Sequence, residues 1–167
     1  MGITSIANVD PDALNLKTFL DNVLERVVSV FQSYSVPIPA RQYWTVGQQA
    51  IDCEQLVVTL IQLYLGPPGD QASMPQKCNM PRTAVMTVSI SRSIPTVGQN
   101  GRPPSSDTIE RAAEISAVDA WVLMQSINLL DIWEEGGYGV GVIATADIPP
   151  PEGGFQTVNM QLTMAVP

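Results

Sequence analysis

The stretch RTAVMTVSISRSI, residues 82–94, alternates between apolar and small polar side chains over most of its length. A period of two is typical of a β-strand with one face in a hydrophobic core and the other toward solvent. Arg92 breaks the pattern near the end of the stretch. We interpret it as a strand-end charge that reaches solvent while its aliphatic stem is buried, in preference to a buried functional ion pair.

Four more stretches favour strands. Residues 155–166 repeat the alternation, with valine, methionine and leucine on one face and threonine, asparagine and glutamine on the other. Residues 53–65 are apolar on both faces, which predicts a strand covered on both sides inside a sheet. Shorter strands are predicted at residues 43–46 and 138–146, where aromatic or β-branched side chains gather.

Apolar residues at helical spacing predict two long helices. The first covers residues 11–33, with Asp10 as its N-cap and Pro11 in its first position. The second begins at a capping box in residues 107–110 and continues to about residue 133. Its apolar stripe includes Ile109 and Met124, and we expect it to lie across a sheet.

The order of these elements, which is helix, three strands, helix and two strands, predicts one α+β domain over residues 1–167. We expect a mostly antiparallel or mixed sheet with two long helices packed on one face. The loops at residues 66–81 and 95–106 are too long and too rich in proline and glycine to be simple connections. We therefore expect them to bind partners.

The composition excludes several classes of active site. The chain of 167 residues contains no histidine, so it cannot hold a Ser-His-Asp triad or a zinc site with imidazole ligands. Its 16 acidic and 8 basic residues give a formal net charge of −8, which opposes tight binding to nucleic acid. Cys53 and Cys78 are too far apart for a Cys-x-x-Cys site, and we interpret them as free, mostly buried thiols.

No other pattern points to chemistry, and we predict no catalytic, cofactor-binding or metal-binding residues. The glycines of residues 136–141 follow a helix and open a strand, whereas a phosphate-binding loop follows a strand and opens a helix. Glu134 and Glu135 are interpreted as a solvated pair at a helix end. The chain also lacks a long apolar run and a signal-peptide pattern, so we expect neither a membrane span nor export.

Over nearly its whole length the chain resembles the tail terminator proteins of long-tailed actinobacteriophages, which are small proteins of the neck between tail and head. The resemblance is carried by the opening amphipathic helix and by three segments, DCEQLVVT at residues 52–59, ISRSIP at residues 90–95 and AVDAW at residues 117–121. These motifs are structural and not catalytic. The resemblance implies a virion protein of the tail or neck, without enzymatic activity, that is assembled in the host cytoplasm.

The same resemblance implies a homo-hexameric ring that caps the tail tube, ends tube polymerisation and joins the tail to the head. Its partners would be copies of itself, the tail tube subunit and the head-tail connector or stopper protein, with no membrane contact. DNA would pass through the ring without specific binding, and we expect more acidic than basic side chains on the inner wall. The low charge of the chain suits the apolar contacts of a ring.

The candidate interface residues are those of one loop tip and one tryptophan, namely Gly98, Gln99, Asn100, Gly101, Arg102 and Trp44. Two alternatives stay open. The protein could be another neck or tail component, such as a head-to-tail stopper, a tail tube subunit or a minor tail protein. A small enzyme working with carboxylates alone would need acidic side chains from separate segments to meet in one pocket.

Overall fold

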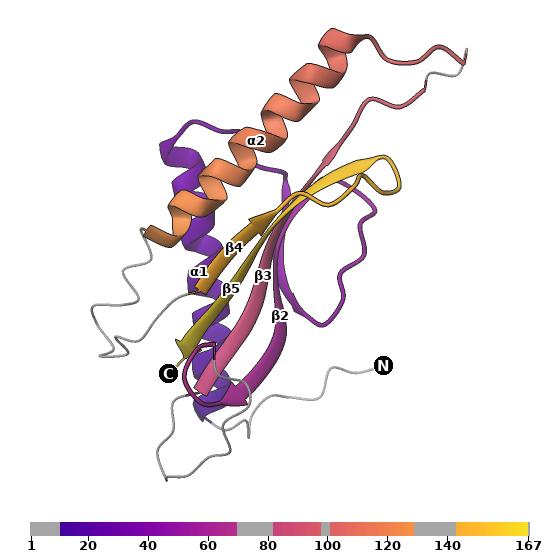
Figure 1. Cartoon of the computed structure of the whole chain (residues 1–167). Coiled ribbons are helices and arrows are strands. Elements are labelled where there is room, and N and C mark those ends of the chain that lie inside the picture. The colour runs from indigo at the N-terminus through magenta and orange to yellow at the C-terminus, as the bar shows by residue number, and fades with distance from the viewer. Residues whose placement is uncertain (1–10, 70–81, 98–100, 129–142, 167) are drawn as a thin grey trace.

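The computed structural model describes residues 11–69, 82–97, 101–128 and 143–166, which form a mixed five-stranded sheet and two helices (Figure 1). The strands are β1 (Arg41–Val46), β2 (Gln55–Leu65), β3 (Arg82–Ser93), β4 (Ile143–Asp147) and β5 (Phe155–Val166). Their spatial order is β1-β2-β3-β5-β4, with β1 parallel to β2 and all other neighbours antiparallel. The predicted α+β class with a mixed sheet is confirmed.

Both helices, α1 (Pro11–Ser33) and α2 (Ser106–Asn128), pack on the same face of the sheet. This inner face carries rows of apolar side chains across neighbouring strands, for example Val58, Val88 and Met160. The buried apolar residues that the helices add to this core are Phe19, Leu20, Val23, Val27, Val30 and Phe31 from α1 and Val122 and Leu123 from α2. The predicted packing of two long helices on one face is therefore confirmed, and burial of this apolar surface holds the two layers together.

The opposite, outer face of the sheet is covered more than the sequence predicts. Because β1 and β2 are parallel neighbours, the connection at residues 47–54 has to return along the strands before β2 can begin. It does so over the outer face, where Thr59 Oγ1 donates to Gln49 Oε1 at 3.5 Å and Gln55 Nε2 donates to the Ala50 carbonyl at 2.8 Å. Thr59 and Gln55 are consequently buried.

Ser89 and Ser91 of β3 are buried as well, so the prediction that the polar side of residues 82–94 faces solvent is wrong for these two. Ser89 Oγ donates to Asn159 Oδ1 at 2.8 Å, and the hydroxyl groups of Ser91 and Thr157 share a hydrogen bond of 3.0 Å. These bonds between neighbouring strands satisfy polar groups that would otherwise lose water without compensation.

The end of β2 is more exposed than predicted. Residues 55–60 are all buried, as expected for an inner strand covered on both sides. A register shift between Leu60 and Gln62 then interrupts the pairing with β3. Ile61, which lies within this shift, is 53% exposed, and Leu63 and Leu65 beyond it are 48% and 52% exposed. The prediction of a strand covered on both faces therefore holds for only the first half of β2.

α2 begins slightly earlier than predicted and extends past the sheet. Its N-cap is Ser105, whose Oγ accepts a hydrogen bond from the Thr108 backbone N–H at 3.3 Å, and not the predicted capping box. None of the residues 106–115, all of which the structure describes, is buried, because these turns project beyond the strands (Figure 1). The predicted continuation of this helix to residue 133 lies outside the described residues, and so does the first part of the predicted strand at 138–146.

The face that α2 turns toward the sheet also differs from the predicted stripe. Ile109 and Met124, two members of that stripe, are exposed, whereas the polar residues Asp119 and Ser126 are buried. Ser126 Oγ donates to the Leu123 carbonyl within its own helix at 2.6 Å, so burial leaves it satisfied. Asp119 is satisfied differently, by a residue of β3.

Leu123→Ala should destabilise the protein strongly, because Leu123 is fully buried between α2 and the sheet and its removal leaves a cavity. We expect the free energy of unfolding to fall by about 3 kcal/mol. Leu63→Ala is the matched control, since Leu63 is 48% exposed, and it should cost less than about 1 kcal/mol. Urea unfolding measures both, and equal losses would contradict the packing described.

Candidate functional site

A buried ion pair joins the end of β3 to the middle of α2. Arg92 Nε donates to Asp119 Oδ2 at 2.5 Å, and Arg92 Nη2 donates to Asp119 Oδ1 at 2.9 Å, so the contact is bidentate. The side chain of Asp119 is 1% exposed and that of Arg92 is 16% exposed. The interpretation of Arg92 as a strand-end charge in solvent is therefore wrong, because α2 crosses the sheet where Arg92 leaves it.

The guanidinium group of Arg92 also holds the connection between α1 and β1. Its Nη2 donates to the Pro37 carbonyl at 2.6 Å. Three segments that lie far apart in the sequence thus meet at one side chain: the α1–β1 connection, the end of β3 and the middle of α2. Because both oxygens of Asp119 accept from Arg92, the pair acts as a structural clamp and leaves no free acid or base at this point.

Glu54 adds a second carboxylate beside the pair. Its Oε1 accepts hydrogen bonds from the Ser93 backbone N–H at 3.1 Å and from Ser93 Oγ at 2.5 Å. These bonds, together with the positive charge of Arg92, lower the pKa of Glu54 below its ordinary value. Burial raises the pKa of Asp119 above its ordinary value, although the hydrogen bonds and charge of Arg92 oppose that shift. The pKa values of the two carboxylates thus shift in opposite directions, because hydrogen bonds dominate at Glu54 and burial dominates at Asp119.

A groove of about 840 Å³ opens beside the ion pair, and we call it the α2 groove. Its walls are the first turns of α2, the end of β3 and the α1–β1 connection. The apolar part of its lining consists of Val36, Pro37, Ile94, Pro95, Ala112, Ile115 and Val118. Its ionisable groups are the carboxylates Glu54, Asp107, Glu110 and Glu114 and the guanidinium groups Arg92 and Arg111. Acidic groups outnumber basic ones in this lining.

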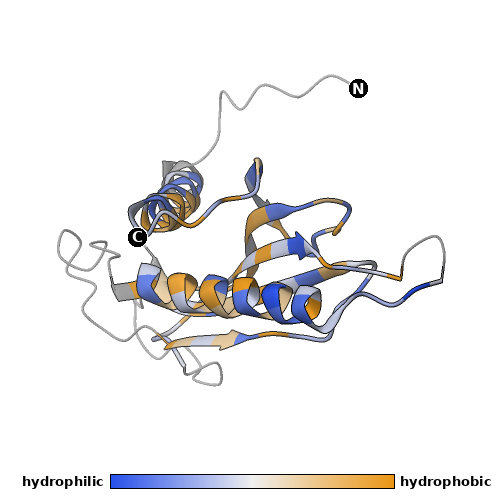
Figure 2. Ribbon diagram, turned by 90° about the horizontal axis from the view of Figure 1, so that it is seen from above, coloured by the Kyte–Doolittle hydropathy of each residue, from blue (hydrophilic) through white to orange (hydrophobic). Residues whose placement is uncertain are grey.

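Apolar side chains continue from the groove along the solvent side of α2. Ile115, Val118 and Trp121 follow one another at intervals of three residues and are 42%, 44% and 51% exposed. Tyr34 packs edge-on against Trp121, with ring centroids 4.9 Å apart and an interplanar angle of 74°. We call these four residues the α2 stripe. Figure 2 shows hydrophobic and hydrophilic residues interleaved along this helix.

The sequence did not single out the α2 stripe or the groove. Ile115, Val118 and Trp121 fall outside the predicted apolar stripe of the helix, and their spacing alone does not distinguish a second apolar face from the first. One feature of the sequence could have indicated the α2 stripe: the apolar residues of this helix cover more of its circumference than the single face that packs on the sheet. The groove is lined by residues from five separate segments, the α1–β1 and β1–β2 connections, the end of β3, α2 and β5, and no local pattern in the sequence predicts that they meet.

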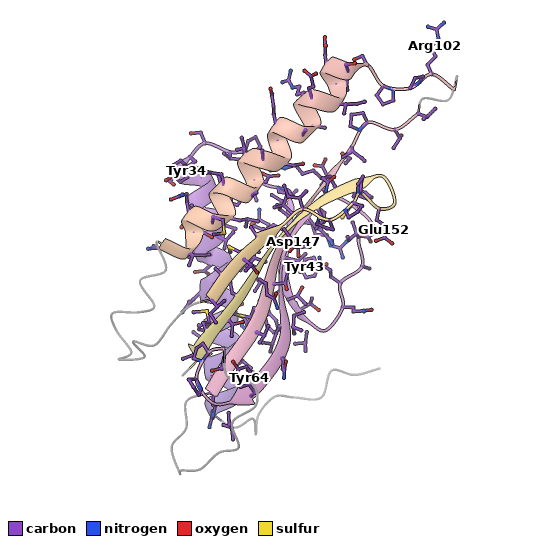
Figure 3. All side chains as sticks on the ribbon, viewed as in Figure 1. Tyr34, Tyr43, Tyr64, Arg102, Asp147 and Glu152 are labelled. Carbon is purple, nitrogen blue, oxygen red and sulfur yellow. The ribbon has the colours of Figure 1, made fainter. Side chains whose placement is uncertain are left out.

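The predicted interface residues lie in separate places. Gly101 and Arg102 are exposed on the connection between β3 and α2, and Arg102 lies at its outer end, away from the body of the protein (Figure 3). Gly98, Gln99 and Asn100 lie outside the described residues. Trp44 is on β1, half-buried, and its Nε1 donates to Asp21 Oδ1 of α1 at 2.7 Å. Trp44 thus packs on the core and is not brought together with the loop.

Among the described residues, neither Cys53 nor the remaining carboxylates form a metal-binding group. Cys53 is half-buried with a free thiol, its Sγ accepts a hydrogen bond from Arg41 Nη1 at 3.3 Å, and Cys78 lies outside the described residues. Within the described ranges, no group of three or more acidic or cysteine side chains is placed to hold a metal ion. Neither α1 nor α2 is apolar enough over a sufficient length to cross a membrane.

Comparison of the chain with protein-family models found no match, and comparison with curated proteins found none. Function therefore has to be inferred from the chemistry and geometry of the chain itself.

Arg92→Met should destabilise the protein by about 3 kcal/mol, because it leaves the carboxylate of Asp119 buried without a partner. The double variant Arg92→Met/Asp119→Leu should recover most of that loss, since no charge then stays buried. Urea unfolding of the single and double variants measures the coupling.

The control for this pair is Arg41→Met. Arg41 and Asp52 form an ion pair of 2.6 Å whose side chains are 47% and 64% exposed, so its loss should change stability little. If Arg92→Met proved as mild as Arg41→Met, the clamp described here would be refuted.

Proposed function

We propose that the protein is a structural subunit of a phage tail that forms a closed ring, caps the tail tube, ends tube polymerisation and joins the tail to the head connector. One support is the resemblance carried by residues 52–59, 90–95 and 117–121. Each of these segments contributes one group to the charged cluster beside the groove, namely Glu54, Arg92 and Asp119. The motifs of the resemblance thus coincide with the contacts that position α2.

The observation that carries the proposal is the exposed apolar surface of the α2 stripe, continuous with the α2 groove. Large apolar patches on a protein surface often mark sites of interaction with another protein. Trp121 and Tyr34 are large aromatic residues of the kind that anchor protein interfaces. A surface of this type on the side of a helix suits repeated contact with neighbouring copies.

The mechanism in this proposal is steric. Three charged groups of the site have a structural role, because Arg92 binds Asp119 and Glu54 accepts hydrogen bonds from Ser93. A ring seated on the last layer of tube subunits would cover the surface to which the next layer binds and would offer a new surface to the connector. The net charge of −8 per subunit would repel the phosphates of passing DNA and keep it from adhering.

Native mass spectrometry of the purified protein should find a closed ring, with the mass of a hexamer. Val118→Asp should shift the population toward monomers, because it places a charge in the apolar stripe. Ile61→Asp is the control, since Ile61 is 53% exposed on the sheet, away from α2. Open polymers of undefined length would favour the tail tube subunit instead. A monomer both in solution and in assembled particles would refute the ring.

A further inference from the structure

We infer that the connection between β3 and α2 of one subunit inserts into the α2 groove of the next copy, an inference that rests on the proposed ring. We call the described residues 96–97 and 101–104 of this connection the arm. The occupant of the groove is then a second copy of this chain. The argument has three independent parts, which are charge, apolar surface and direction.

The charges of arm and groove are complementary. Arg102 is the sole charged residue between Arg92 and Asp107, and it forms no ion pair with any residue that the structure describes. On the groove side, Glu110 and Glu114 likewise have no ion-pair partner among the described residues. Opposite charges without partners on two exposed surfaces are what a polar rim contact between copies requires.

The arm also carries apolar surface, and its two prolines limit the conformational entropy that it loses on docking. Val97 is 62% exposed, and Pro103 and Pro104 follow Arg102 directly. Proline fixes φ, so this segment loses less conformational entropy on docking than a flexible loop would. The groove offers apolar walls from both sides, including Ile115 of α2 and Val36 of the α1–β1 connection.

The direction of the arm indicates a neighbour as its partner. The arm extends away from the body of its own subunit, and Arg102 lies at its outer end (Figures 1 and 3). The groove instead lies between the first turns of α2 and the end of β3. Two different patches of one subunit that fit each other make a head-to-tail contact. Such a contact closes into a ring when the rotation between neighbours divides a full turn.

Charge reversal on either side should break the contact. Arg102→Glu places a negative arm against a negative groove, and Glu110→Arg/Glu114→Arg places a positive arm against a positive groove. We expect each variant alone to associate at least about tenfold more weakly than the unaltered protein, because like charges then meet. Native mass spectrometry measures the oligomers, and circular dichroism checks that each variant is folded.

Mixing the two variants is the decisive experiment. In the mixture, the negative arm of the first variant fits the positive groove of the second, and the positive arm of the second fits the negative groove of the first. We expect rings with equal numbers of both variants, in alternation. Rings restored only in the mixture cannot arise from an arm that packs on its own groove.

Lys17→Glu is the charge-matched control for Arg102→Glu, since both substitutions change the net charge by the same amount. Lys17 lies on α1, and its side chain is 56% exposed. This control should leave the rings intact. Rings of unaltered stability in Arg102→Glu, or a mixture that stays dissociated, would refute the arm-in-groove contact while leaving the ring itself standing. Failure of the unaltered protein to form rings at all would instead refute the proposed function.

Discussion

The ion pair between Arg92 and Asp119 determines how α2 lies on the sheet, and the surface of the protein follows from that placement. A carboxylate that is 1% exposed is costly to keep ionised unless its oxygens are satisfied. Here a bidentate guanidinium group satisfies both oxygens and also binds the Pro37 carbonyl. Well-packed apolar residues could stabilise the fold equally well. The role of the pair is therefore to fix the orientation of α2, since Asp119 reaches Arg92 in only one rotation of the helix about its axis.

That rotation decides which side chains of α2 meet solvent. With Asp119, Val122 and Leu123 against the sheet, Val118 and Trp121 are turned outward. The turns before Ser116 then extend past the strands, and the groove forms between them and the end of β3. One polar contact thus connects the packing of the core to the apolar surface on which the proposed assembly depends.

Local patterns in the sequence predicted the helices and strands well, but they predicted poorly which faces of these elements are buried. The bounds of α1 and β5 agree with prediction, because their apolar residues recur at one clear period beside proline or glycine. The burial of Ser89 and Ser91 was missed, because it depends on the parallel pairing of β1 with β2 and on the return of the chain over the outer face. The exposed position of Arg102 on a loop was predictable, whereas the partner of Arg92 was not. Asp119 lies 27 residues from Arg92 along the chain, and no spacing rule connects a strand end to a point inside a later helix.

Hydrogen–deuterium exchange on assembled rings and on dissociated subunits tests the central claim, that the arm and the first turns of α2 form the contact between copies. Exposed helical turns with few buried contacts exchange quickly in the free subunit, and burial in an interface slows them. Assembly should therefore increase protection in residues 101–118 and leave β2, which contributes nothing to the groove, unchanged. Unchanged exchange in residues 101–118, with new protection confined to the sheet, would contradict the account.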